Sequence, residues 1–550
     1  MKVYEALARA FAAEGATDVF GMMGDANMYW MNSLQELGVR LYECRHEGAA
    51  LGMADGMARI TGQPGVVTTT CGPGTAQIAT TALVAARART PLVAFCGEAP
   101  LSDPEYVQHL DQARFAAACE LGFFQVSTAN GALEATQRAF YQARAESRPV
   151  MLSVPMDIQQ MTIDDDDYEY LPSFELLPQE LIYPNPAAIS AAADAIATAE
   201  RPVIIVGRGA VASGSGEAVL ALAEDIGAII ATTLLTKSFL GQDDYYVGVS
   251  GLYSTRTAME LFGESDCVIA VGAGMNNYTT EHGYLYPSAA FIQIDTKPSI
   301  VMGDGRAPNH FIHSDARLAV EQLHATLVER GVHSSGFRTP EVKDRLVTAL
   351  DDTQHYDLEP GTVDPREVCR FLDDAIPPDI GLILGGGSSS GFPTMLMTRQ
   401  RRVMLANHHF GCIGMGLLTA MGVVTATGNQ PAMLFDGDAG FMMHLAEFET
   451  AVRYRMPLMV VVLNDQRLGS EYHKAKVQGI DPAYTEIPTP DLGAVGRSLG
   501  GRGTLVTHLD ALRQVAAEFV ADPAPTIVDV RMSGNVVTIP YRRVHYGQDA

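Results

Sequence analysis

The chain has 550 residues, of which 47% are hydrophobic and 19% are charged. This length exceeds the roughly 250–300 residues at which one hydrophobic core stops growing, so we expect three domains of ordinary globular composition. The formal net charge is −26, and no run rich in Lys or Arg interrupts it, which argues against nucleic acid and anionic membranes as partners.

The N-terminus and the cysteines indicate where the chain is expected to work. The first residues, MKVYEALARAFAAEG, predict an amphipathic helix rather than a signal peptide, and no apolar run reaches the roughly 18–20 residues of a membrane span. The seven cysteines are scattered without Cys-x-x-Cys or zinc-type spacing, which predicts buried reduced thiols. We therefore expect a cytoplasmic protein with no membrane partner.

The first part of the chain, residues 1–165, alternates short apolar runs with helical patterns. GVVTTT (65–70) and PLVAFCGE (91–98) are two of these runs, and each is typical of a buried strand. The acidic run 164–167 and the proline-bearing stretch 171–186 follow. Clustered like charge and proline resist packing, so we predict a linker there.

The remainder of the chain repeats this pattern twice. Residues 186–332 contain β-branched runs separated by helical segments, and residues 360–545 contain a third set of such runs. Polar sequence from 333 to 360 predicts a connection between them. Strands that alternate with helices form parallel sheets, so the fold class predicted is α/β with three tandem doubly wound parallel-sheet domains.

Two polar clusters follow neighbouring predicted strands of the third unit. The run PAMLF leads into Asp436–Gly440, and the run PLMVVVL leads into Asn464 and Asp465. The carboxyl ends of neighbouring parallel strands form the ligand-binding edge of such sheets, and oxygen ligands there suit Mg²⁺. Small residues after Asp438 would let backbone N–H groups approach a diphosphate. Each cluster alone reads more readily as a turn, but together they predict a metal and diphosphate site.

With these motifs, essentially the whole chain resembles the thiamine-diphosphate enzymes of the acetolactate synthase, pyruvate decarboxylase and benzoylformate decarboxylase family. In that family a Gly-Asp-Gly motif, followed at a fixed spacing by Asn, binds Mg²⁺ and the cofactor diphosphate. The resemblance implies a pyrimidine-binding domain at 1–165, a central domain at 186–332 and a diphosphate-binding domain at 360–545.

The same resemblance implies the metal and cofactor contacts. Asp438 matches the first metal ligand, Asp465 stands where the family usually has Asn, and the backbone carbonyl of Arg467 matches the third ligand. The additional charge of Asp465 should weaken diphosphate binding unless the metal dominates the local field, and Mg²⁺ accepts carboxylates readily. Ala439 replaces the last Gly of the motif. The residues expected to contact the cofactor are Gly72, Gly387, Ser388, Ser389, Gly411, Ile413, Gly437, Asp438, Ala439, Gly440 and Asp465.

Glu47 lies in the segment Arg-His-Glu-Gly-Ala-Ala, which precedes a helix of small residues. Without context Glu47 reads as a helix cap, but its motif closely matches the family's activating glutamate, a poorly solvated carboxylate that engages the cofactor's pyrimidine nitrogen. Ile413 matches the wedge residue between the cofactor rings, and the Gly411 carbonyl matches the acceptor of the 4′-amino group. In this family that glutamate meets the diphosphate site of another subunit. The resemblance therefore implies a homodimer or homotetramer with active sites at the subunit interface.

The reaction implied is decarboxylation of a 2-oxo acid through an enamine intermediate, with thiamine diphosphate and Mg²⁺ as cofactors. Asp25 and Glu471 match proton-handling acids of pyruvate decarboxylase, His109 lies near a decarboxylase histidine pair, and Gln108 resembles a synthase glutamine. Asp25 also reads as a turn residue and Glu471 as a solvated helix start. The acids favour a lyase that releases an aldehyde, with some carboligase activity, and an acetolactate-synthase-like carboligase or transferase is the alternative.

Three further observations concern other segments. Residues 274–277 (Gly-Met-Asn-Asn) lack the Arg expected where flavin would be held, so FAD is left open as a cofactor but is not supported. The turn Gly207-Arg208-Gly209 leaves open a nucleotide-binding, non-catalytic protein, although three residues without the full glycine spacing are a weak signal. His408 and His409 precede the wedge residue and are candidates to face the substrate.

Overall fold

The computed structural model of the protein describes residues 1–163, 170–178, 181–237, 239–297, 305–348, 352 and 354–547. The acidic run 164–167, which the sequence assigns to a linker, lies outside the described residues. Within the described part, no helix is both long enough and apolar enough to cross a membrane. All seven cysteines are free and six of them are buried, as predicted for reduced thiols.

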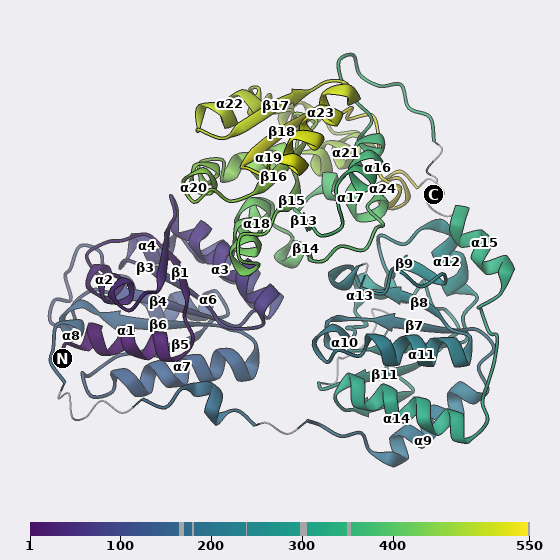
Figure 1. Ribbon diagram of the computed structural model, residues 1–550, viewed down its shortest axis with the longest axis horizontal. Coiled ribbons are helices and arrows are strands. Elements are labelled where there is room, and N and C mark those ends of the chain that lie inside the picture. Colours follow the sequence, from purple (N-terminus) through teal and green to yellow (C-terminus); the bar gives the residue numbers. More distant parts are fainter. Residues whose placement is uncertain are drawn as a thin grey trace.

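The N-terminal unit is a six-stranded parallel sheet with helices on its faces (Figure 1). Its strands are β1 (Asp18–Gly21), β2 (Arg40–Glu43), β3 (Gly65–Thr69), β4 (Leu92–Glu98), β5 (Gly122–Gln125) and β6 (Pro149–Pro155). Its helices are α1 (Val3–Ala13), α2 (Met28–Glu36), α3 (Glu47–Thr61), α4 (Pro73–Ala76), α5 (Ala79–Ala88), α6 (Gln112–Ala118), α7 (Ala132–Glu146) and α8 (Met156–Gln159). The strands pair in the order β2-β1-β3-β4-β6-β5. The predicted amphipathic helix is α1, which buries Val3, Leu7 and Phe11 at the spacing of one helix face.

The middle unit repeats this architecture with the strand order β12-β11-β10-β7-β8-β9. Its strands are β7 (Pro202–Val206), β8 (Ile229–Thr232), β9 (Tyr246–Val249), β10 (Cys267–Val271), β11 (Ala290–Asp295) and β12 (His310–His313). Its helices are α9 (Pro186–Ala197), α10 (Arg208–Ala212), α11 (Gly216–Ile226), α12 (Arg256–Gly263), α13 (Asn277–Thr280), α14 (Ala316–Glu329) and α15 (Pro340–Thr348). The central strands β7 and β10 are buried along their whole length because helices cover both faces of the sheet.

The third unit has the strand order β14-β13-β15-β16-β18-β17. Its strands are β13 (Gly381–Leu384), β14 (Met404–Ala406), β15 (Ala432–Gly437), β16 (Leu458–Asn464), β17 (Arg502–Val506) and β18 (Thr526–Arg531). Its helices are α16 (Pro365–Ala375), α17 (Gly391–Leu396), α18 (Met415–Ala426), α19 (Asp438–Met443), α20 (Glu447–Arg453), α21 (Gly469–Val477), α22 (Leu492–Ser498), α23 (Leu509–Ala521) and α24 (Ile539–Tyr546). Three parallel sheets with covering helices confirm the predicted α/β class.

Helix α3 of the first unit packs directly on helix α18 of the third, and the two units share one hydrophobic core (Figure 1). Small residues allow this close approach. A Cβ atom at Gly52 would lie 2.7 Å from the Cβ of Leu418, and one at Gly56 would lie 2.8 Å from the Cα of Thr419. Because α3 begins at Glu47 and α18 follows the wedge segment, this contact fixes two elements of the candidate site relative to each other.

Both predicted connections contain packed residues. For the first connection, this corrects the expectation that its residues resist packing. After the first unit, the Ser173 hydroxyl and backbone N–H both donate to the buried carboxylate of Glu14, at 2.8 Å each. Between the middle and third units, the chain forms α15, and Phe337 and Val342 join the core of the middle sheet. Isolated apolar residues in polar sequence carry no periodic signal, so pattern reading missed these contacts.

Candidate active site

The two polar clusters of the third unit meet at one edge of its sheet, as predicted. β15 ends at Gly437 and α19 begins at Asp438, while the neighbouring β16 ends at Asn464, directly before Asp465. β13, on the other side of β15, leads into the loop that contains Ser388. Because all three strands are parallel, the three loops lie together at their carboxyl ends.

Close contacts among Gly437, Gly469, Ser388, Ser389 and Asp465 enclose a space between these loops, which we call the cradle. A Cβ atom at Gly437 would lie 2.8 Å from the Ser389 hydroxyl oxygen. One at Gly469, at the start of α21, would lie 2.7 Å from the Ser388 hydroxyl oxygen and 2.9 Å from Oδ2 of Asp465. Side chains larger than hydrogen would therefore fill the space between the loops.

The wedge residue of the sequence analysis borders the same cradle. Cβ atoms at Gly387 and Gly440 would each lie 3.5 Å from an Ile413 carbon. The segment before Ile413 bends sharply, with positive φ at Phe410 (61°) and Gly411 (69°). Ile413 itself is partly exposed rather than part of the core. The structure thus brings together the cofactor residues predicted in the third unit.

Two carboxylates dominate the electrostatics of the cradle. Burial, followed by the charge of Asp465, raises the pKa of Asp438 to about 8. Burial raises the pKa of Asp465 to about 6, although Arg467 opposes this shift. Burial of both carboxylates, together with the charge of Asp465 beside Asp438, disfavours the ionised forms, which fits a site for a divalent cation that would stabilise them.

The third predicted metal ligand lies next to this pair. The backbone N–H of Arg467 donates to Oδ1 of Asp465 at 3.1 Å, and its guanidinium forms an ion pair with Glu359 at 2.8 Å. The Arg467 side chain is therefore engaged away from Asp465. A role for its backbone carbonyl as a ligand stays a prediction.

Asp436, which sequence reasoning did not assign, lies behind the cradle. Its Oδ1 accepts from the backbone N–H of Gly437 at 3.0 Å, whereas its buried Oδ2 has no partner among the described residues. Burial raises its pKa to about 7. The only sequence signal was its position two residues before Asp438, and we infer that Asp436 orients the Gly437 peptide.

The first unit holds a second set of predicted residues at the carboxyl edge of its sheet. Glu47 begins α3 and is 9% exposed, and a Cβ atom at Gly74 would lie 3.0 Å from its Oε1. Gly72 has φ of 54°, and a Cβ there would lie 2.9 Å from the carbonyl carbon of Gln108. The Cys71 thiol in turn donates to the Gln108 side-chain oxygen at 3.1 Å. The loop around Gln108 therefore lies on the Gly72 turn beside Glu47.

Two other candidates of the first unit are exposed at this edge. Asp25 lies in the turn after β1, and its charge adds to the effect of burial in raising the pKa of Cys71. His109 follows Gln108, and its backbone N–H donates to the carbonyl of Tyr106 at 2.9 Å. The structure thus places Asp25 and Gln108 near Cys71, whereas the His109 side chain is exposed.

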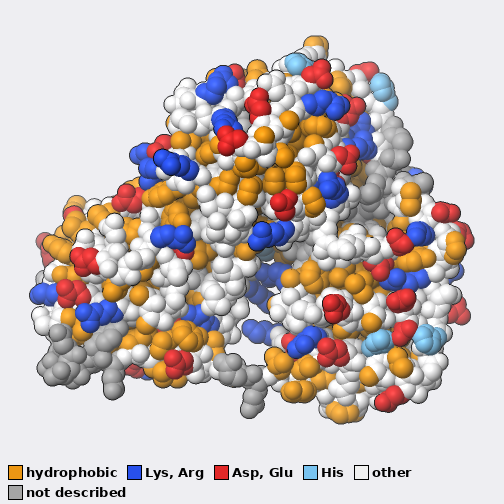
Figure 2. Space-filling model, viewed as in Figure 1, with side chains coloured by type: hydrophobic (Ala, Val, Ile, Leu, Met, Phe, Trp, Pro, Cys, Tyr) orange, Lys and Arg blue, Asp and Glu red, His pale blue; other side chains and the backbone are white. Residues whose placement is uncertain are grey.

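The edge of the first unit around Glu47 and the cradle of the third unit are two half-sites, and within the described part of one chain they are not hydrogen-bonded to each other. Among the described residues, no hydrogen bond or ion pair connects Glu47 or Asp25 with the cradle of the third unit. The turn before α3 is held instead by α20, since the guanidinium of Arg45 pairs with Glu449 at 2.7 Å. Exposed hydrophobic side chains flank both half-sites: Met23, Leu101 and Val107 in the first unit, and Phe410, Met442 and Met443 in the third. Figure 2 shows hydrophobic side chains gathered on the visible face of the third unit.

Glu471 lies in the first turn of α21, the helix whose start borders the cradle. Its side chain is exposed and forms an ion pair with Lys474 at 3.3 Å. The neighbouring Ser470 accepts a hydrogen bond from the hydroxyl of Tyr541 on α24 at 2.7 Å. The C-terminal helix therefore contacts the helix that carries Glu471, a contact that nothing in the local sequence predicts.

The histidines before the wedge residue are partly buried and lack partners on one nitrogen. The Nε2 atoms of His408 and His409 are buried without a hydrogen bond among the described residues. Burial, with a smaller effect of Arg59, lowers the pKa of His408 to about 4, so the imidazole is neutral at neutral pH. The ring of Tyr253, from the middle unit, lies 5.7 Å from that of His408. Tyr253 is a site residue that sequence reasoning missed.

Two other features of the middle unit bear on the alternatives. The Gly207-Arg208-Gly209 turn packs against β10, where the N–H of Gly207 donates to Val271 and that of Gly209 to Gly272, each at 3.0 Å. These amides are occupied, so the turn is not a preformed phosphate cradle. The Arg208 guanidinium donates to the Ala88 carbonyl of the first unit at 2.6 Å, which makes it a domain contact.

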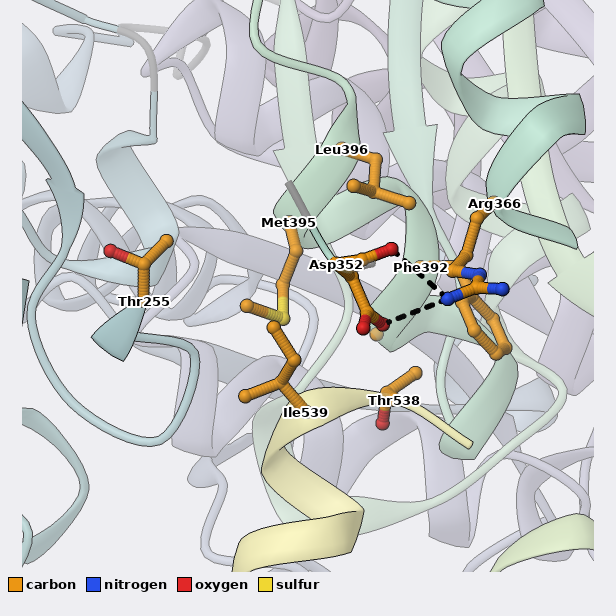
Figure 3. A pocket seen from close by; sticks show the side chains of 9 residues that line it. Thr255, Asp352, Arg366, Phe392, Met395, Leu396, Thr538 and Ile539 are labelled. Carbon is orange, nitrogen blue, oxygen red and sulfur yellow. Dashed lines mark hydrogen bonds and ion pairs between the residues drawn. The ribbon is translucent and has the colours of Figure 1, made fainter. Parts of the chain in front are cut away.

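A small apolar cavity lies where α17, α24 and the middle unit meet (Figure 3). Its volume is about 20 Å³, enough for a single water molecule. Thr538 and Ile539 face Met395 and Leu396 across it, and the ion pair between Arg366 and Asp352 lies at one end. This cavity is too small for a substrate, and the candidate site remains the cradle.

Comparison with known proteins agrees with this geometry. Three family models match the chain: the N-terminal TPP binding domain of thiamine pyrophosphate enzymes over residues 1–121, their central domain over 189–323, and their C-terminal TPP binding domain over 385–530. A probable acetolactate synthase large subunit of Methanocaldococcus jannaschii is 27% identical over 96% of this chain and 92% of its own length. A sulfoacetaldehyde acetyltransferase of Castellaniella defragrans is 28% identical over 98% and 94%. The large subunit of acetolactate synthase isozyme 2 of Escherichia coli is 27% identical over 95% and 94%.

Proposed function

Because the chain belongs to the thiamine pyrophosphate enzymes, within the acetolactate synthase family, we propose that it decarboxylates a 2-oxo acid with thiamine diphosphate and Mg²⁺. The observation that carries this proposal is the cradle in which the paired carboxylates Asp438 and Asp465 lie beside the hydroxyl groups of Ser388 and Ser389. When bound, the cofactor would accept the electron pair that remains as CO₂ leaves.

The residues of the third unit have separate tasks in this proposal. Asp438, Asp465 and the carbonyl of Arg467 would hold the cation, and the backbone at Gly437–Gly440 would approach the diphosphate, where the start of α19 offers N–H groups. Ile413 would keep the two cofactor rings apart, and the Gly411 carbonyl would orient the amino group. Paired carboxylates and small residues fit a cation and a diphosphate together.

Glu47 would hold or release a proton at the cofactor's pyrimidine nitrogen. Its low exposure and the close fit of Gly74 keep water from the carboxyl group. Since Glu47 is not joined to the cradle of its own chain, we propose a homodimer or homotetramer in which Glu47 completes the cradle of another copy. Sedimentation of the holoenzyme as a monomer at assay concentration, with full activity, would contradict that assembly.

Two fates of the decarboxylated carbon compete in this proposal. Asp25 and Glu471 are acids at the edges of the two half-sites, and together they support protonation and release of an aldehyde. Gln108, held against Cys71, and the similarity to acetolactate synthases support transfer of the carbon to a second carbonyl compound. We place protonation first and carboligation second.

The test supplies pyruvate, benzoylformate, oxalyl-CoA and branched 2-oxo acids in turn, with and without an acceptor carbonyl such as sulfoacetaldehyde. Products are then quantified by mass. We expect CO₂ and an aldehyde from one of the acids. The variant Glu471→Gln should shift products toward the condensation product, because slower protonation leaves more time for attack on the acceptor. If wild type forms only condensation product and Glu471→Gln leaves the ratio unchanged, the carboligase is the better assignment.

A further inference from the structure

A second cavity, separate from the cradle, lies between α21 and the C-terminal segment. Its volume is about 190 Å³, which corresponds to about six water molecules at the volume of liquid water. Its lining includes His473 and Lys476 of α21, Arg542 and Tyr546 of α24, and Tyr356. Figure 1 shows α21 and α24 next to each other near the C-terminus.

The cavity wall carries positive charge that the surrounding acids do not fully neutralise. Arg542 is 6% exposed and pairs with Asp352 at 2.9 Å, but its buried Nε has no partner among the described residues. Asp352 also faces Arg366 at 3.4 Å, and Arg366 forms a closer ion pair with Asp364 at 2.7 Å, so two carboxylates serve two guanidinium groups and the remaining positive charge is that of Lys476. For Lys476, the described contacts include the ring of Tyr472 at 5.2 Å but no carboxylate.

The other groups around the cavity add no negative charge to it. His473 bonds through Nδ1 to the Tyr546 hydroxyl at 2.7 Å, and burial lowers its pKa to about 4, so it is neutral at neutral pH. Glu359, which contacts the lining residue Gly534, is engaged by Arg467 at 2.8 Å and by the N–H of Gly534 at 2.7 Å. The cavity is therefore a local cationic site on a protein whose net charge is −26.

The dipole of helix α21 explains only part of the positive charge at this cavity. Lys474 and Lys476 lie in the last turn of α21, where cations favour the helix C-terminus. That effect does not require a cavity, and it does not explain a buried guanidinium of α24 with an unused N–H. Buried donors without partners are rare in natural proteins unless water or a ligand satisfies them.

We propose that this cavity binds a small organic anion, a phosphate ester or a carboxylate, with Lys476 and Arg542 as its charged partners. The rings of Tyr356 and Tyr546 would cover the apolar part of the ligand. Lys476 lies seven residues beyond Gly469 at the cradle, a rise of about 10 Å along α21. An anion here would therefore be distinct from the cofactor diphosphate, and it would bind α21 and α24 together.

Calorimetry on the holoenzyme tests the proposal. Thiamine diphosphate and Mg²⁺ are present at saturation, so that the cradle is filled, and ionic strength is held constant with chloride. Inorganic phosphate, methyl phosphate and acetate are titrated in turn. We expect one saturable site per chain, and the relative affinities of methyl phosphate and acetate show which anion class the cavity prefers.

Two variants of the same helix separate this cavity from other anion sites. Lys476→Gln should weaken binding at least about tenfold, the size of one lost charge-assisted hydrogen bond. Lys474→Gln, whose side chain pairs with Glu471 outside the cavity, should bind as wild type does. Thermal unfolding confirms that both variants are folded. The absence of saturable binding for every anion, or equal weakening in both variants, would overturn the proposal.

Discussion

The contact between α3 and α18 offers the sharpest test of how the fold positions the site. In Gly56→Ala, the new Cβ would lie 2.8 Å from the Cα of Thr419 and 2.9 Å from its carbonyl carbon. Carbon atoms need about 3.5 Å, so the helices must separate by about 0.7 Å or the backbone must shift. Backbone atoms cannot rotate away as a side chain can, and overpacking of this kind costs about 1–3 kcal/mol.

Alanine also favours a helix more than glycine does, so the control variant must share this gain in helix propensity. Gly263 ends α12, and a Cβ there meets nothing within 4 Å, so Gly263→Ala adds the same methyl group without a clash. Urea unfolding is followed by far-UV circular dichroism, which reports the helices of all three units, because Trp30, the single tryptophan, is buried in the first unit and would not report on α12. We expect Gly56→Ala to be less stable than Gly263→Ala by about 1–3 kcal/mol, with lower activity because a shift of α3 and α18 displaces Glu47 and Ile413 in the two sites that they are proposed to serve. Equal midpoints for the two variants would refute the packing argument.

Three other predictions concern the site and its surroundings. Glu47→Gln should bind thiamine diphosphate and Mg²⁺, but exchange of the cofactor's C2 hydrogen, followed by NMR, should be about 10²–10⁴-fold slower than in wild type. The control Glu43→Gln, at an exposed position of β2, should exchange this hydrogen at the wild-type rate. Exchange at the wild-type rate in Glu47→Gln would show that Glu47 does not have this role. Asp438→Ala should abolish Mg²⁺-dependent cofactor binding in a fluorescence titration, and Asp465→Asn should retain it; normal binding by Asp438→Ala would place the site elsewhere. When the pH falls from 7 to 5, the free energy of unfolding of wild type should decrease by about 2 kcal/mol more than that of His473→Gln. The pKa of His473 in the folded state, about 4, lies below its value in the unfolded state, so the unfolded state takes up the proton first. Equal losses of stability in wild type and His473→Gln, measured by urea unfolding, would contradict the lowered pKa of His473.

The sheets could be predicted because buried parallel strands have a simple sequence signature. β16 reads LMVVVLN and is buried throughout, and β4 reads LVAFCGE with the same burial. A strand covered on both faces needs apolar residues at every position, so its run is continuous rather than alternating. Once these strands are recognised, the residues that follow them must lie at one edge of a sheet. This is why Asp438 and Asp465 could be assigned to one site before their positions were known.

Contacts between distant segments could not be predicted in this way. Tyr253 approaches His408 from the middle unit, and Tyr541 approaches Ser470 from the C-terminal helix. Each is a single polar residue in a loop or helix start, where neither periodicity nor local propensity distinguishes it from a solvated residue. Their positions depend on how the three units dock, and that docking depends on contacts such as those of Gly56, which leave no local pattern in the sequence.

Buried polar atoms without partners provide a signal for function that is independent of any family resemblance. Among the described residues, nine such atoms occur, and four of them lie at or near a proposed site: Oδ2 of Asp436 behind the cradle, Nε2 of His408 and His409 beside the wedge residue, and Nε of Arg542 at the second cavity. The other five, on Asp18, Trp30, Gln112, Arg401 and Thr538, lie elsewhere, so the signal needs a second observation such as a cavity. Leaving a buried polar group unpaired costs about 1–3 kcal/mol, so a fold keeps such groups where a ligand or water can satisfy them. Three of the four atoms near proposed sites lie around the cradle, which the motifs had already indicated. The fourth lies where no motif pointed, and that is why the anion cavity could be inferred only from the structure.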